Sequence, residues 1–222
     1  MRRLLPLGLA LLAVTACSDL VTPLRTNPYE YRKFISKGLP DGSVDTVLFH
    51  WPRNFLPVRV WVAADDPLRP HMTTAIDRWN ATFLYGEFRA MMVNDSNAAD
   101  VIVRNVVAPA GGEAPPITLS AFAPECRGET DLFYNLSART IILPVRMYIY
   151  PRFSTTPPGL DDCYRITATH ELGHALGLLE HSPSASDLMF SDPVLDGISE
   201  RDRITAETVY HLPATYTPVN RR

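Results

Sequence analysis

The sequence predicts one α+β domain in which a mixed β-sheet packs against helices. The order of the elements supports this fold class, because strand-like and helix-like segments follow one another as strand, helix, three strands and two helices. The length supports it too, since a chain of 222 residues can bury a substantial core in one domain even after it loses an N-terminal leader.

The first strand and the first helix are predicted from the spacing of their apolar residues. Residues 46–63 end in alternating valines, which is the pattern of a strand: Val58, Val60 and Val62. Residues 66–84 carry large apolar side chains at helical spacing: Met72, Ile76, Trp79 and Phe83. Met72 and Trp79 are therefore expected to lie in the core. Pro70 is compatible with a helix only near its start.

Three more strands and two helices are expected downstream. The strands are predicted at 99–107, 117–122 and 139–145. Loops are predicted at 108–116 and at 151–162, and a helix is expected to begin near Arg165. The last helix begins at Ser199, which can cap it, and Asp202 lies in its first turn.

The N-terminus has the pattern of an export signal. "MRRLLPLGLALLAVTAC" has a basic start and an apolar run that is too short to span a bilayer. Its ending, Val-Thr-Ala-Cys, resembles a bacterial lipobox, which implies that residues 1–16 are removed and that Cys17 carries lipid; the alternative is an ordinary signal with an incidental cysteine. We therefore expect an exported lipoprotein on the outer membrane or surface of a bacterium, with residues 17–44 as a tether.

The net charge and the cysteine content indicate which partners and which covalent links to expect. The formal net charge is −3 and no basic patch is present, so nucleic-acid binding is not expected. Nothing in the chain indicates more than a monomer. Cys126 and Cys163 remain after the leader, and two such cysteines in an exported chain most often form a disulfide; the alternative is two free thiols.

The stretch "THELGHALGLLEHSPSASDLMF", residues 169–190, has the spacing of a zinc site. His170 and His174 are four residues apart, so on a helix their rings share one face and can reach one ion at about 2.0–2.1 Å. Glu171 follows the first histidine. Zinc lowers the pKa of a bound water to about 7, and this carboxylate could then move its proton to the leaving amine.

The third ligand is ambiguous. Glu180 is the tenth residue after His170, which is the position of the third histidine in the pattern HExxHxxGxxH, whereas His181 is the eleventh. An unbroken helix would carry His181 about 10 Å along the axis beyond His174, too far to share the ion. The chain must therefore reverse, and Gly177 can end the helix in the left-handed conformation. Imidazole is the more usual third nitrogen ligand, which favours His181.

The pattern "HELGHALGL…HS…DLMF" resembles the metzincin zinc peptidases, in particular the matrixins and their bacterial relatives. These proteins have a methionine turn below the zinc, eight residues after the third histidine. The eighth residue after His181 is Met189, whereas Glu180 leads to Leu188. The resemblance therefore implies that His181 is the ligand, that Glu180 points to solvent or the second shell, and that Asp202 ties the last helix to the methionine turn.

The resemblance also implies the architecture of residues 45–215, with residues 216–222 as a tail. It implies a metzincin-like catalytic domain with a mostly parallel, twisted sheet, an antiparallel edge strand, an active-site helix and a C-terminal helix. "TLSAFAPE" looks like the edge strand that binds extended substrate, which assigns peptide binding to Leu119, Ser120, Ala121 and Phe122; the alternative is an ordinary strand. Residues 191–195 would line the pocket for the side chain after the cut.

The sequence differs from the family pattern at positions that affect how many metal ions are expected. The remaining histidines are scattered singly, so one catalytic zinc ion is expected: His50, His71 and His211. Asp161 and Asp162 could bind calcium, although a solvated loop is the simpler interpretation. No cysteine lies between Cys17 and Cys126, which leaves no propeptide cysteine to block a zinc ion.

The sequence thus predicts a lipid-anchored zinc endopeptidase that hydrolyses extended polypeptides. A non-catalytic surface lipoprotein that keeps the fold for binding is the alternative, and cleavage of cell-wall peptide bonds is a third interpretation. The presence of Glu171 favours an enzyme, because metal binding alone does not require that carboxylate.

Overall fold

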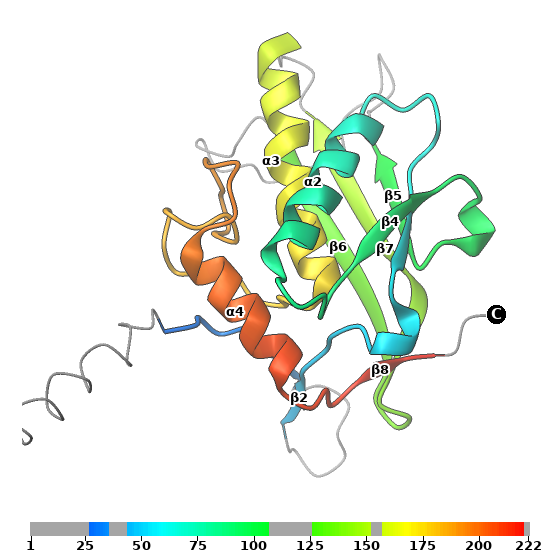
Figure 1. Cartoon of the computed structure of the whole chain (residues 1–222), viewed down its shortest axis with the longest axis vertical. Helices are drawn as coiled ribbons and strands as arrows, with labels where there is room; N and C mark the ends of the chain where they lie inside the picture. Colours follow the sequence, from blue (N-terminus) through cyan, green and yellow to red (C-terminus); the bar gives the residue numbers. More distant parts are fainter. Residues whose placement is uncertain (1–26, 36–43, 107–125, 152–156, 220–222) are drawn as a thin grey trace, which may run out of the picture.

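The computed structural model describes residues 27–35, 44–106, 126–151 and 157–219. In these residues the chain forms an α+β domain with a mostly parallel mixed sheet, three α-helices and an antiparallel edge strand, as Figure 1 shows. The predicted fold class is confirmed at this level.

The main sheet has six strands. Its order is β4 (Ala90–Val93), β3 (Val58–Trp61), β5 (Val101–Asn105), β7 (Thr140–Pro151) and β6 (Cys126–Asn135), and β8 (Thr217–Pro218) also pairs with β7. Every pairing is parallel except that of β6 with β7. A separate antiparallel pair is formed by β1 (Lys33–Ile35) and β2 (Asp45–Val47).

Two helices cover one face of the sheet. α2 (Arg69–Thr82) and α3 (Pro157–Leu176) lie side by side there, and the indole N–H of Trp79 donates to the carbonyl of Thr169 at 2.8 Å. Alternate residues of the strands point toward these helices and are buried, among them Val60, Val101, Val103, Val145 and Met147. Met72 and Trp79 of α2 are both fully buried, which confirms that they belong to the core.

α4 (Glu200–His211) lies at the C-terminal end of α3, where the Tyr210 hydroxyl donates to the carbonyl of Leu176 at 2.9 Å. Ser199 caps α4, and its backbone N–H donates in return to the Asp202 carboxylate. The start predicted for this helix is therefore confirmed. Two short 3-10 turns, η1 (Arg53–Phe55) and η2 (Ser96–Ala98), complete the elements.

Two predicted boundaries near α3 were wrong. The loop expected at 151–162 is shorter, because β7 extends to Pro151 and α3 begins at Pro157 rather than near Arg165. Proline is favoured in the first helical turn, where its missing N–H has no intrahelical partner, so this proline-containing segment starts a helix instead of preventing one. The strands β4 and β6 were not predicted, and the strand expected at 117–122 lies outside the described residues.

The folded unit is longer at both ends than the predicted 45–215. Tyr29 is buried and β1 pairs with β2, so residues 27–35 pack on the domain instead of serving as tether. Tyr216 is fully buried and β8 joins the sheet, so the expected tail also contributes to the fold. The predicted signal and Cys17 lie outside the described residues, within which no helix is long and apolar enough to cross a membrane.

Candidate metal centre

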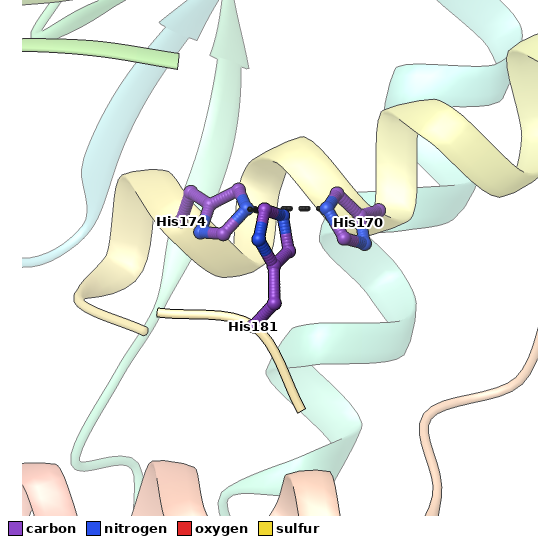
Figure 2. Close-up of side chains that lie close together, drawn as sticks. All are labelled: His170, His174 and His181. Atoms are coloured by element: carbon purple, nitrogen blue, oxygen red, sulfur yellow. Dashed lines mark hydrogen bonds between the residues drawn. The ribbon is translucent and has the colours of Figure 1, made fainter. Parts of the chain in front are cut away.

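Three histidine rings converge beside the C-terminal part of α3, as Figure 2 shows. His170 and His174 project from consecutive turns of the helix, and their Nε2 atoms are 3.1 Å apart. His181 comes from the segment that follows the helix, and its Nε2 lies 3.2 Å from that of His174. One ligand atom from each residue lies within 4.8 Å of the others, so this group could hold a metal ion.

The ring orientations fit metal binding. Nδ1 of His170 donates to the carbonyl of Leu188 at 2.8 Å, and Nδ1 of His174 donates to that of Leu178 at 2.5 Å. A carbonyl can only accept, so the Nδ1 atoms carry the hydrogens and the Nε2 lone pairs face the centre of the group. Nitrogen ligands on a tetrahedral ion at 2.0–2.1 Å would be separated by about 3.3 Å, close to the separations observed.

The histidines are also held in the neutral form that binds metals. Burial lowers the pKa of His170 to about 4 and lowers the pKa of His174 well below its usual value. Burial lowers the pKa of His181 as well. At neutral pH all three rings can therefore offer a lone pair.

The reversal after α3 takes place at Gly177. The helix ends at Leu176, and Gly177 has a φ of 126°, a conformation that side chains rarely adopt. The N–H of Leu178 donates to the carbonyl of Gly173 at 3.1 Å, which closes the end of the helix. A Cβ atom at Gly177 would also lie less than 3.0 Å from the carbonyl oxygen of Phe49.

The structure separates the two candidates for the third ligand. His181 is in the histidine group, whereas the Glu180 carboxylate lies 3.1 Å from the ammonium nitrogen of Lys33 on β1. Glu180 is therefore directed away from the metal centre.

Met189 packs against α3 at Gly173 and is fully buried. Its sulfur packs on Gly173, because a Cβ there would lie less than 3.0 Å from Sδ and 3.0 Å from the Trp79 ring. The backbone N–H groups of Leu188 and Met189 donate to the buried Asp202 carboxylate at 2.8 and 3.3 Å. Asp202 thus connects α4 to the segment that contains Leu188 and Met189.

Gly173 was not identified from the sequence. The signal available was a glycine between the two helical histidines, where an alanine would favour the helix more strongly.

Glu171 faces the edge strand β6 and is 4% exposed. The hydroxyl of Thr130 donates to its Oε2 at 2.6 Å, and a Cβ at Gly128 would lie less than 3.0 Å from Oε1. Burial raises the pKa of Glu171 to about 7, while the hydrogen bond from Thr130 acts in the opposite direction. Neither β6 residue was singled out from the sequence, since nothing local relates them to Glu171.

The Cys126–Cys163 disulfide joins β6 to α3 upstream of His170 and His174. The two aspartates considered for calcium are engaged otherwise, since Asp161 lies 3.5 Å from His71 Nε2 and Asp162 pairs with Arg165. The residues expected to bind substrate lie outside the described residues: Leu119, Ser120, Ala121 and Phe122.

No protein-family model matches the chain, and a search of curated proteins finds none that is significantly similar. The functional interpretation therefore depends on the residues and their geometry.

Proposed function

We propose that the chain is a zinc-dependent endopeptidase of the metzincin type, similar to the matrixins, which hydrolyses peptide bonds in extended polypeptides. The observation that carries the proposal is that three histidine Nε2 atoms converge beside α3. Glu171, the residue after His170 on this helix, carries a buried carboxyl group. A purely structural zinc site is usually closed by four protein ligands, whereas three leave a position for water and substrate.

Zinc fits this donor set. The group contains three neutral imidazoles and no carboxylate, and imidazole ligands suit zinc better than magnesium or calcium. A bound zinc ion would polarise the scissile carbonyl and acidify an attacking water molecule. We propose a single catalytic ion.

The protein residues would handle the protons. Glu171 accepts the proton of the attacking water on the carboxylate oxygen that Thr130 does not hold, and then transfers it to the leaving amine. Gly173 lets the Met189 sulfur pack directly under the ligand helix, which keeps the two helical histidines in position.

We also propose that the protein is exported and anchored by lipid at Cys17, because the leader ends in a lipobox-like sequence. Incorporation of labelled fatty acid that is lost in Cys17→Ser would support this proposal. Equal labelling of the variant would contradict it.

The peptidase proposal is tested with the zinc-loaded chain and a peptide library. Turnover should be lost in Glu171→Gln while the zinc content stays at one ion per chain, and His181→Ala should lose zinc. Glu180→Gln is the matched control and should keep both zinc and turnover, since Glu180 pairs with Lys33. A zinc-loaded wild type that cleaves no peptide, or full activity in Glu171→Gln, would refute the proposal; the first result would favour a binding protein.

A further inference from the structure

We propose that two residues of β6, Gly128 and Thr130, form a seat that orients the Glu171 carboxylate, with Thr130 as a positioning residue for this group. The inference rests on the proposed function for its catalytic meaning, but the seat itself is a structural claim about three residues, Gly128, Thr130 and Glu171.

The contact between Thr130 and Glu171 is direct. The Oγ1 of Thr130 lies 2.6 Å from Oε2 of Glu171, and the same atom lies 3.2 Å from the Glu171 carbonyl oxygen. The hydroxyl has a single hydrogen, and the shorter distance to a carboxylate oxygen marks where it is donated. This hydrogen bond fixes Oε2 of the carboxylate, and Oε1 lies next to Gly128.

Gly128 provides the space in which the carboxylate lies. Residues 128 and 130 face the same side of the strand, because side chains alternate along it. A Cβ at Gly128 would lie less than 3.0 Å from three side-chain atoms of Glu171, Oε1, Cδ and Cγ. Any larger residue would therefore force the Glu171 side chain out of this position.

Burial makes the seat necessary. Glu171 is 4% exposed, and among the described residues it makes no ion pair with a lysine, arginine or histidine. A carboxylate removed from water needs hydrogen-bond donors in compensation, and Thr130 supplies one from its side chain.

The seat has a fixed position relative to the histidines. The Cys126–Cys163 disulfide joins β6 to α3 two residues before Gly128, and the pairing of β6 with β7 holds the rest of the strand. Glu171 lies on α3 between the two helical ligands. The strand therefore orients the carboxylate against the same helix that carries the metal ligands.

The test compares Thr130→Val, Thr130→Ser and Gly128→Ala, all loaded with zinc. Thr130→Val removes the hydroxyl and keeps the branched shape, so kcat should fall by about 10- to 100-fold, with KM and zinc affinity nearly unchanged. Thr130→Ser restores the hydroxyl and should recover most of kcat. Thr73→Val is the matched control, because the Thr73 hydroxyl is on the exposed side of α2 and donates only to the carbonyl of Arg69 in its own helix; it should behave as wild type.

A crystal structure of each variant gives a readout that does not depend on activity. We expect the Glu171 carboxylate to leave its position in Thr130→Val and in Gly128→Ala, and to keep it in Thr130→Ser. An unmoved carboxylate in both disruptive variants, or an unchanged kcat in Thr130→Val, would overturn the positioning role. A wild type without turnover would refute the peptidase proposal, and the crystal structures would still decide whether the seat exists.

Discussion

Replacing Gly177 by alanine should damage both the stability of the fold and the affinity for metal. The residue ends α3 between His174 and His181, with a φ of 126°. A non-glycine residue in such a conformation costs about 1–3 kcal/mol. The new Cβ would also lie less than 3.0 Å from the carbonyl oxygen of Phe49, and this backbone atom cannot rotate away as the end of a side chain could.

The overlap adds to the conformational cost. Forcing an extra methyl group into a packed site typically costs about 1–3 kcal/mol, so the two effects together lower the free energy of unfolding by about 4 kcal/mol. That is a large fraction of the roughly 5–15 kcal/mol by which domains are stable. The strain falls on the turn that presents His181, so zinc affinity should fall by about tenfold or more, comparable to losing a hydrogen bond that orients a metal ligand.

The assay is urea denaturation of the metal-free protein, together with competition against a chromophoric zinc chelator. Gly197→Ala is the matched control, since a Cβ at that position meets no atom within 4 Å. Its free energy of unfolding should stay within about 0.5 kcal/mol of wild type, and its zinc affinity should be unchanged. If the free energy of unfolding of Gly177→Ala lies within about 1 kcal/mol of that of Gly197→Ala, our explanation of the turn is wrong.

Three further predictions concern the supports of the metal centre. Replacing both Cys126 and Cys163 by alanine should cost about 4 kcal/mol in chemical denaturation, because the bridge closes a loop with a sequence separation of 37; a loss below about 1 kcal/mol would contradict this. Asp202→Asn should lower the free energy of unfolding by about 2 kcal/mol, measured in the same way, because it removes a buried charged acceptor of backbone hydrogen bonds. Burial opposes ionisation of Asp187, yet hydrogen bonds from Ser182 and neighbouring groups lower the pKa of this carboxyl. Its stabilisation should therefore be complete above about pH 4 and be lost as the pH falls through the lowered pKa, and Asp187→Asn should flatten this part of the pH profile of urea unfolding.

Local spacing was sufficient to predict the parts of the structure that depend on one segment. The apolar residues of α2 and the capping residue of α4 follow from periodicity and from hydrogen bonding within a few residues. The same holds for His170 and His174, because four residues make one helical turn and bring their Nε2 atoms to 3.1 Å.

The parts that were missed depend on contacts between distant segments. β6 is a polar strand at the edge of the sheet, so its sequence shows no sustained apolar alternation to predict it. Thr130 and Glu171 are 41 residues apart, and Tyr29 reaches Asp202 across 173 residues. No pattern within a single segment could relate these pairs.

Tyr31 and Lys33 both contact the turn that follows α3. The backbone N–H of Leu179 donates to the carbonyl of Tyr31 at 3.1 Å, and Lys33 pairs with Glu180. Both side chains of this ion pair are substantially exposed, and such pairs contribute at most about 1 kcal/mol, so its main effect is to orient Glu180 away from the histidines. The backbone hydrogen bond is the firmer support, because it satisfies an amide in a turn that has left the helix. The position of His181 therefore depends on a segment about 150 residues earlier in the chain, and spacing along the motif alone could not reveal that segment.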